Sequence, residues 1–521
     1  MLLRHCLFLA SAALVRALPR HALLARVIDS KVAAETAYDF VIAGGGTAGL
    51  TVADRLTENP NVKVLVIEYG PFDNGEDYVL VPGAFFPVPY MWLTLLSTPQ
   101  SALNDQVYGV TCARVVGGGS TINAMFFHRG SAGEYNSWEA LGAEGWTWDG
   151  LLPYFKKSET FHAPDADLAE QWNVTYDASV HGSTGPIQVS YPPYDYPGSE
   201  RFWNAAVRMG FPTVQDPNAG QAIGIFRLLH SVDPATQTRS YSRRAHYDRV
   251  KVRSNYHIFP NTAVAKVIFQ GTTATGVEFI DLATKVKSIA KATKEVIVAA
   301  GAVHTPQILQ LSGVGRKTDL QALGIRTVSD LPGVGSNLQD HLVLTVNYNF
   351  TNNLFPNGGS LNANQTYDAE QRALYDAGQP SAYTITRTTG NLILFLSLQN
   401  DPSPQKSLPS GTAQQVLKGY IAQRKQILKL LKAGNSIGDI SWNTGPATSV
   451  YMTRPLSRGS VKLGSTDPLA DPLGDFGAIT DPADLEFLLA IYKKNRELMK
   501  TPEIAPLGPI ELGEAAGLIR S

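Results

Sequence analysis

The sequence predicts a mixed α/β fold in which a discontinuous Rossmann-like domain is joined to a second domain that contains an antiparallel sheet. Two strand–turn–helix units indicate the first domain, one at residues 38–68 and another at 295–311. The long insertion between these units and a change in composition after residue 346 indicate the second domain. A chain of 521 residues is long enough for two packed domains.

The first unit begins with an apolar run at 38–43 and continues into a glycine-rich turn at 44–49. A helix is expected from Thr47, burying Leu50, Ala53 and Leu56, until Asn59-Pro60 ends it. The run at 62–68 is β-branched and aliphatic, which is typical of a parallel strand buried on both faces. Strand, turn, helix and strand together predict a nucleotide-binding unit.

The glycines of this turn have different tasks in such a unit. Gly44 permits the tight turn, Gly46 lets the backbone approach a pyrophosphate, and Gly49 allows close packing of helix on strand. The helix N-terminus offers amide donors to the phosphates. Glu68 follows Gly44 at the distance expected of the acid that accepts ribose hydroxyls. These features predict a bound dinucleotide.

The second unit places a strand at 295–300, with Thr305 as helix N-cap and Pro306 as the first residue of a helix that continues over 307–311. Two later helices are expected. One is amphipathic over 416–432 and closed by Gly434; the other is capped by Asp481-Pro482. In the second of these, four apolar residues are expected on one face: Leu485, Leu488, Leu489 and Tyr492.

Charge and hydropathy exclude some classes of protein. The 44 basic and 45 acidic side chains nearly cancel, so no electrostatic footprint for nucleic acid is expected, and no apolar run is long enough for a membrane span. Residues 1–17 have a basic start, an apolar stretch and a small-residue cleavage site ending at Ala17, which predict a signal peptide and a secreted protein. Its removal would leave Cys112 as the only cysteine. The sequons at Asn173, Asn349 and Asn364 are consistent with N-glycans.

A second glycine-rich segment, Ala113-Arg114-Val115-Val116-Gly117-Gly118-Gly119-Ser120-Thr121-Ile122-Asn123-Ala124-Met125, resembles the first signature of the glucose–methanol–choline (GMC) oxidoreductases. The segment at 301–315 resembles the second signature of that family, and 145–155, 331–341 and 454–461 resemble its supporting blocks. The chain is therefore similar to fungal-type secreted members from about residue 38 to the end. The resemblance implies an FAD-dependent enzyme that oxidises a small-molecule alcohol by hydride transfer to flavin N5. The reduced flavin would then pass its electrons to O₂ or another acceptor. The implied setting is secondary metabolism or extracellular oxidation.

By the same resemblance, the side chains and backbone lining the FAD are expected at Thr47, Ala48, Glu68, Val116, Gly119, Asn123, Ala124 and Met125, with Val264 against the adenine. Ile122 stands where some relatives have a flavin-linking histidine, so non-covalent FAD is expected. The implied organisation is a signal peptide (1–17), an N-terminal family region (38–345), a substrate or cap domain (346–451) and the start of a C-terminal region (452–521). No metal ligands are expected.

The chain departs from the family pattern at its end. The family's His-Pro segment, which carries the catalytic histidine, has no counterpart before Ser521, and no catalytic residue is assigned. An incomplete oxidoreductase is the favoured interpretation. The alternatives are a non-redox lyase or cyclase on the same scaffold and a pseudoenzyme. Such a chain is expected to show little alcohol oxidation by itself.

The other polar residues near the signatures receive mainly structural interpretations. His128 is interpreted as a hydrogen-bonded histidine and is the next candidate for the base. His304 is expected in a loop that serves the cap, and His341 in surface scaffolding. Cys112 is expected to be a buried filler. For Arg239 and Arg243 a structural role is at least as well supported as contact with substrate.

Overall fold

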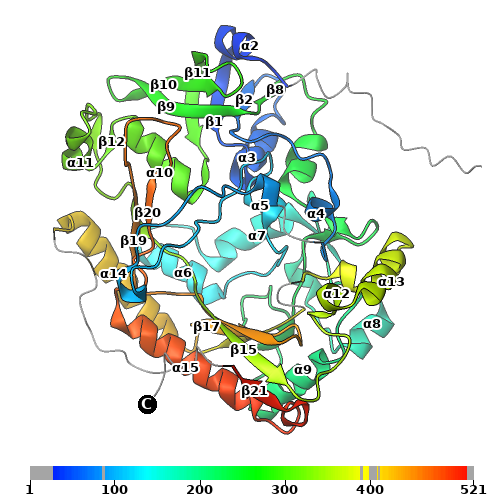
Figure 1. Ribbon diagram of the computed structural model, residues 1–521. Coiled ribbons are helices and arrows are strands. Elements are labelled where there is room, and N and C mark those ends of the chain that lie inside the picture. Colours follow the sequence, from blue (N-terminus) through cyan, green and yellow to red (C-terminus); the bar gives the residue numbers. More distant parts are fainter. Residues whose placement is uncertain (1–26, 85–87, 388–390, 398–407, 409–410, 513–521) are drawn as a thin grey trace, which may run out of the picture.

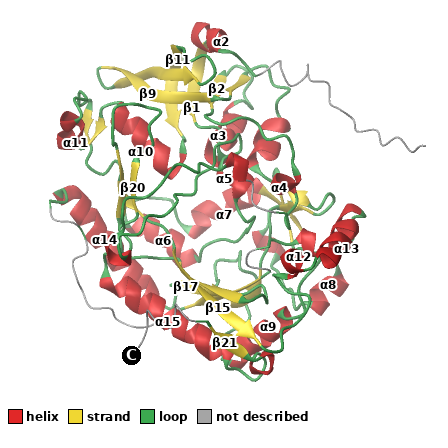
Figure 2. Ribbon diagram, in the orientation of Figure 1, coloured by secondary structure: helices red, strands yellow, loops and turns green. Residues whose placement is uncertain are grey.

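Two large sheets organise the molecule, one toward each end in the view of Figure 1. The computed structural model describes residues 27–84, 88–387, 391–397, 408 and 411–512. The predicted signal peptide at 1–17 lies outside these residues. Five helices lie between the two sheets (Figures 1 and 2): α3 (Thr47–Leu56), α5 (Gly119–Ile122), α6 (Ala132–Ala140), α7 (Trp148–Ser158) and α10 (Gly301–Leu311). The predicted mixed α/β class is confirmed: the first sheet is parallel except for a terminal hairpin, and the second is antiparallel.

The first sheet has the strand order β8-β2-β1-β11-β10-β9. Its first four strands pair in parallel, and β10 and β9 extend it as an antiparallel hairpin. Every residue of β2 is buried, as predicted for a strand covered on both faces. The strands are β1 (Ala37–Ala43), β2 (Val64–Ile67), β8 (Tyr256–Phe259), β9 (Thr262–Gln270), β10 (Thr273–Asp281) and β11 (Lys287–Val298).

Three helices flank this sheet: α2 (Ser30–Glu35), α3 (Thr47–Leu56) and α10 (Gly301–Leu311). Helix α3 begins at the predicted residue and buries Leu50 and Ala53. The predicted start of α10 is wrong, because the helix begins at Gly301 and Pro306 lies inside it. Gly301 has a φ of +81°, so the chain turns directly from β11 into the helix and Thr305 is not needed as a cap.

The second sheet is antiparallel throughout, with the order β21-β15-β18-β17-β16-β5. Its strands are β5 (Gly224–Arg227), β15 (Leu342–Phe350), β16 (Leu392–Leu396), β17 (Gly438–Ser441), β18 (Ala447–Met452) and β21 (Pro509–Glu511). Strands β5 and β21 and the start of β15 come from outside residues 346–451. The second sheet therefore crosses the limits predicted for the cap domain, and these domain limits stay a prediction.

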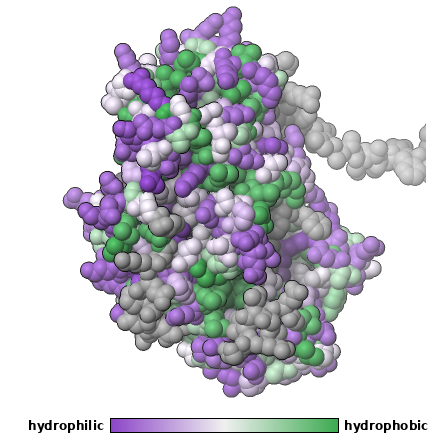
Figure 3. Space-filling model, turned by 60° about the vertical axis from the view of Figure 1, so that its left-hand side comes forward, coloured by the Kyte–Doolittle hydropathy of each residue, from purple (hydrophilic) through white to green (hydrophobic). Residues whose placement is uncertain are grey.

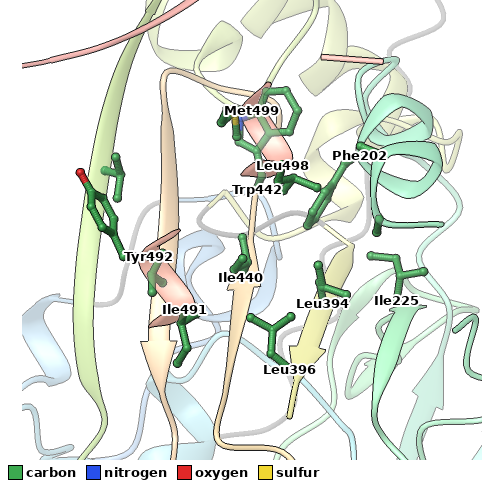
Figure 4. Packing of buried hydrophobic residues seen from close by; sticks show 14 of the residues in the cluster. Phe202, Ile225, Leu394, Leu396, Ile440, Trp442, Ile491, Tyr492, Leu498 and Met499 are labelled. Carbon is green, nitrogen blue, oxygen red and sulfur yellow. The ribbon is translucent and has the colours of Figure 1, made fainter. Parts of the chain in front are cut away.

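One face of the second sheet carries the largest apolar core. Helices α9 (Ser199–Arg208) and α15 (Pro482–Met499) pack on it, as Figure 4 shows. Asp481 caps α15 as predicted, accepting a hydrogen bond from the Ala483 amide. The predicted apolar face is correct only in part, since Leu485 is 51% exposed. The buried side of α15 is formed by Ala483, Phe487, Ile491, Tyr492 and Leu498.

Shorter elements connect these layers. The predicted amphipathic helix is present as α14 (Gln414–Lys432), followed by Gly434 with a φ of +83°. The remaining helices are α4 (Asp77–Leu80), α5 (Gly119–Ile122), α6 (Ala132–Ala140), α7 (Trp148–Ser158), α8 (Ala166–Gln171), α11 (Lys317–Ala322), α12 (Ser360–Ala363) and α13 (Gln365–Asp376). The remaining strands are β3 (Glu159–His162), β4 (Ile187–Ser190), β6 (Val232–Asp233), β7 (Thr238–Arg239), β12 (Val314–Gly315), β13 (Ser329–Asp330), β14 (Ser336–Leu338), β19 (Gly459–Lys462) and β20 (Leu473–Asp475).

The surface mixes hydrophilic and apolar side chains. On the face drawn in Figure 3, apolar side chains form separate patches between hydrophilic areas. Within the described part of the chain, no helix combines the length and apolarity that crossing a bilayer requires. The sequon asparagines Asn173, Asn349 and Asn364 are all exposed.

Candidate cofactor site

A cavity of about 610 Å³ lies at the carboxyl ends of β1 and β2, where the N-termini of α3, α5 and α10 converge. Parallel strands with helices on their carboxyl side commonly bind nucleotides at this edge. Of the residues predicted to bind the cofactor, those that line this cavity are Gly44, Gly46, Thr47, Ala48, Glu68, Gly119 and Val264. The two glycine-rich segments, distant in sequence, thus share one site.

The glycines of the first turn separate into two kinds. A Cβ on Gly44 would lie 2.4 Å from the Ala299 carbonyl oxygen, and one on Gly49 would lie 1.9 Å from the Gly44 carbonyl oxygen. Both glycines are therefore required by the packing of the chain on itself. A Cβ on Gly46 would meet only the Cα of Gly118, at 3.6 Å, and would otherwise project into the cavity. Gly46 therefore keeps space open for a ligand.

Glu68 is the acid of the site. Its carboxylate accepts hydrogen bonds from the backbone amides of Gly45 (2.7 Å) and Gly70 (2.8 Å). Burial raises the pKa of Glu68 to about 7, and the two amide hydrogen bonds only partly oppose that shift. A carboxyl group held at the cavity wall by two amides matches the task of accepting ribose hydroxyls.

The second glycine segment is fixed against the first. Gly117 donates its amide to the Gly45 carbonyl at 2.8 Å, and a Cβ on Gly118 would lie 2.6 Å from the Gly46 Cα. The other predicted residues do not line the cavity. Gly49 and Val116 are buried behind it, whereas Asn123, Ala124 and Met125 continue the segment beyond it.

Arg239 holds this segment in place. Its guanidinium is 4% exposed and donates to the carbonyls of Val79 (2.7 Å), Ser120 (3.2 Å) and Asn123 (2.7 Å), and to Asn123 Oδ1 (2.7 Å). Burial lowers the pKa of Arg239 to about 10. Arg243 lies in an ion pair with Asp73 (2.7 Å). The structural interpretation of both arginines therefore agrees with their contacts.

The predicted position of His304 is wrong. It lies in the first turns of α10 and lines the nucleotide cavity, rather than in a loop serving the cap. Its ring packs against the Trp92 ring with centroids 4.5 Å apart and an interplanar angle of 38°, and the Trp92 and Tyr69 ring centroids are 4.4 Å apart. Trp92 and Tyr69 also line the cavity and were not predicted, because no local pattern marks them. Cys112 lines it too, and burial raises the pKa of its thiol to about 11.

His128 and His341 lie on the side of the second sheet. The His128 ring lies 5.6 Å from that of Phe395 on β16, and His128 makes no hydrogen bond to a residue that the structure describes. The predicted hydrogen-bonded histidine is therefore not observed. His128 is exposed. Desolvation by the surrounding protein lowers the pKa of its ring to about 4, and His341 adds to that effect.

The site holds no metal-binding set. Across the residues that the structure describes, no group of three or more histidine, cysteine, aspartate or glutamate side chains is arranged to hold an ion.

Comparisons with known proteins agree with this geometry. A family model described as GMC oxidoreductase matches residues 38–343. The dehydrogenase xptC of Emericella nidulans is 46% identical over 95% of this chain and 81% of its own length. The glucose methanol choline oxidoreductase atC of Aspergillus terreus is 33% identical over 93% of this chain and 81% of its own.

Solved structures give the same picture. An FAD-dependent oxidoreductase from Chaetomium thermophilum aligns with a TM-score of 0.90 and 49% identity, over 91% of this chain and 84% of that one. A fungal aryl-alcohol oxidase aligns with a TM-score of 0.80 and 34% identity, over 92% of this chain and 85% of its own. The cofactor of this fold is FAD. The open space at Gly46 and the ribose acceptor at Glu68 fit that dinucleotide.

Proposed function

The chain belongs to the GMC oxidoreductase family, and from that membership we propose that it oxidises an alcohol with FAD as cofactor. The observation that carries the proposal is the cavity of about 610 Å³ in which both glycine-rich segments meet Glu68. Bound FAD supplies the hydride acceptor. The electron acceptor that follows is O₂ or another small molecule.

The chain's own residues bind and orient the cofactor in this proposal. Glu68 accepts the ribose hydroxyls, and the first-turn amides of α3, beginning at Thr47, face the phosphates. Val264 and Gly119 line the same cavity, and Val264 would lie against the adenine of bound FAD. Arg239 keeps the Gly119 segment in position.

The proposal is tested first by cofactor retention. With a relative's C-terminal segment grafted on, the purified protein is expected to be yellow without added flavin, and Glu68→Ala in the same background to lose FAD on gel filtration. Glu58→Ala is the matched control, because Glu58 is an exposed acid whose one ion-pair partner among the described residues is Arg55 (2.6 Å). A colourless wild-type protein that binds NAD tightly would refute the cofactor assignment.

Turnover is tested separately, by anaerobic bleaching of bound flavin with a panel of alcohols. Bleaching by the chain as given, lost in His128→Ala, would make His128 the base that accepts the hydroxyl proton. Flavin that binds stoichiometrically and is reduced by dithionite, but by no alcohol even after a relative's C-terminal segment is grafted on, would favour a non-redox role.

We also propose entry into the secretory route, supported by the sequence at 1–17 and by the exposure of Asn173, Asn349 and Asn364. Expressed in a secreting eukaryotic host, the protein is expected to begin near Leu18 and to lose mass on treatment with an N-glycosidase. An unglycosylated cytosolic product with an intact Met1 would overturn this proposal.

A further inference from the structure

The connection between strands β19 and β20 reaches the cofactor cavity from a distant part of the chain. It covers residues 463–472, within the predicted C-terminal region, and in Figure 1 it runs beside α10 toward the first sheet. Pro468, Leu469 and Ala470 of this connection line the cavity together with Glu68 and Val264. We call residues 463–472 the clasp. The nucleotide-binding units therefore do not enclose the cofactor by themselves.

The apolar contacts of the clasp place it beside the residues that would hold the adenosine of FAD. Leu469 and Tyr69 pack against the same small cluster, which consists of Ala263, Ala265 and Ile280. Tyr69 directly follows Glu68, the acceptor for ribose hydroxyls, and Ala263 directly precedes Val264, the expected adenine contact. The clasp therefore borders the adenosine half of the cofactor site.

Two hydrogen bonds hold the clasp against the other walls of the cavity. The side-chain amide of Gln307, on α10, donates to the Ala470 carbonyl at 2.8 Å. The Trp92 indole Nε1 donates to Asp471 Oδ1 at 2.7 Å. Hydrogen bonds to a carboxylate are roughly twice as strong as those between neutral groups. Trp92 and Asp471 are both half-buried, so water competes little for this bond.

The bond to Asp471 also fixes an aromatic ring in the cavity wall. The Trp92 ring centroid lies 4.4 Å from that of Tyr69 and 4.5 Å from that of His304. The Arg114 guanidinium lies over the same ring, 5.9 Å from its centroid. All three rings line the cavity, whereas the Asp471 side chain lies behind Trp92 and does not. Asp471 therefore acts on the cavity through Trp92.

From this arrangement we propose that the clasp gives the protein its preference for FAD over FMN, with Asp471 as a positioning residue that acts through Trp92. FMN has the flavin ring, the ribityl chain and one phosphate, but it lacks the adenosine monophosphate half of FAD. Contacts with the clasp and with the Trp92 ring therefore contribute to the binding of FAD alone. This inference rests on the assignment of FAD as cofactor and not on the proposed alcohol oxidation.

The test measures the dissociation constants of FAD and FMN for the chain as given, by equilibrium dialysis with flavin absorbance as the readout. The wild type is expected to bind FAD at least about 100-fold more tightly than FMN. Asp471→Leu removes the hydrogen-bond acceptor and is expected to weaken FAD binding about 10-fold and FMN binding by less than about twofold. Asp471→Asn keeps the Oδ1 acceptor and is expected to retain FAD affinity to within about threefold.

A double-mutant cycle shows whether the hydrogen bond is the cause. Trp92→Phe keeps an aromatic ring but removes the donor, so it is expected to weaken FAD binding about as much as Asp471→Leu does. Because both changes break one bond, the double variant is expected to lose about 10-fold in affinity rather than about 100-fold. Additive losses would show that the two side chains act independently, which contradicts the positioning role of Asp471.

Thr466→Val is the matched control. Thr466 is an exposed residue of the clasp that does not line the cofactor cavity. Its replacement is expected to leave the affinities for both flavins unchanged. Thermal unfolding of each apoprotein checks that the variants fold like the wild type.

Hydrogen exchange locates the contact independently of affinity. At equal saturation, FAD is expected to slow amide exchange in peptides that cover residues 463–472, whereas FMN is expected to leave it unchanged. Equal protection by both flavins would place the clasp on the part of the cofactor that they share, contrary to the proposal.

The outcomes separate the clasp from the cofactor assignment. Equal affinity of the wild type for FAD and FMN, or equal weakening of both flavins in Asp471→Leu, would overturn the clasp and leave the binding of a flavin standing. A loss of FAD affinity in Thr466→Val as large as that in Asp471→Leu would show that any change in this connection has the effect. A wild type that binds neither flavin would refute the cofactor assignment and the clasp with it.

Discussion

Replacing Arg239 with Met should loosen the segment that borders the cofactor cavity. The guanidinium makes four hydrogen bonds, to Val79, Ser120 and Asn123, and methionine can make none of them. Charge-assisted hydrogen bonds contribute about 1.5–3 kcal/mol each, so four give an upper bound of roughly 6–12 kcal/mol. Against this stands the burial that lowers the pKa of Arg239 to about 10, a penalty of roughly 3 kcal/mol.

Hydrogen bonds to one side chain are not additive, so we take the lower end and expect a net loss of about 3–5 kcal/mol in the free energy of unfolding. Denaturant unfolding of the apoprotein measures this loss, and the ratio of FAD to protein after gel filtration measures the effect on the cofactor. Arg244→Met is the control, because Arg244 is exposed five residues later and its side chain makes one hydrogen bond to a described residue, the Thr238 hydroxyl at 3.2 Å, besides lying over the Tyr241 ring. If Arg239→Met differs from Arg244→Met by less than about 1 kcal/mol and keeps its FAD, then Arg239 does not hold the segment.

Three further predictions concern a steric contrast and two titrations. Gly46→Ala should fold normally but retain little FAD, because its Cβ makes only an ordinary contact with protein, at 3.6 Å from the Gly118 Cα. Gly49→Ala should fail to fold, because its Cβ would lie 1.9 Å from the Gly44 carbonyl oxygen. Circular dichroism and flavin absorbance separate the two variants, and an FAD-replete Gly46→Ala would contradict the assignment. Burial raises the pKa of Glu68 from 4.5 to about 7. The apoprotein is therefore most stable with respect to this group below pH 4.5, and it loses about 3 kcal/mol of unfolding free energy as the pH rises toward 7. Glu68→Gln should flatten that part of the pH–stability curve, and an unchanged slope would disprove the raised pKa. For His181, burial opposes protonation, but hydrogen bonds to Asp216 and Glu159 (both 2.9 Å) outweigh it and raise the pKa above 6.5. Protonated His181 therefore stabilises the fold fully below pH 6.5, and this stabilisation is lost as the pH rises through the raised pKa. In chemical denaturation, His181→Gln should lower the free energy of unfolding more at pH 6 than at pH 9. Equal losses at both pH values would exclude the ion pairs as the cause.

The local elements of the nucleotide site could be predicted because their signals lie close together in sequence. The glycine turn, α3 and β2 each follow from a short pattern of glycine, apolar and acidic residues. The start of α10 could not, because Thr305-Pro306 is a good helix start and only the positive φ of Gly301 shows that the helix begins earlier. The error moved His304 from the cavity wall to a loop.

Residues that reach the cavity through contacts distant in sequence could not be predicted, for a different reason. Trp92 reaches the cavity by packing against Tyr69 and His304, which no spacing in the sequence encodes. The tertiary packing of these three rings, rather than the residue type, brings Trp92 to the site.

The strand order of the first sheet also constrains how the protein is made. β1 lies between β2 and β11, and Val41 pairs with Val296, about 255 residues later in the chain. A ribosome adding about 5–20 residues per second exposes β1 for roughly 10–50 s before its second neighbour is synthesised. During that interval the apolar flank of β1 and its unpaired backbone groups are open to wrong partners. The cofactor site, which needs both strands, therefore completes late, and folding in the cell should depend on chaperones that shield this edge.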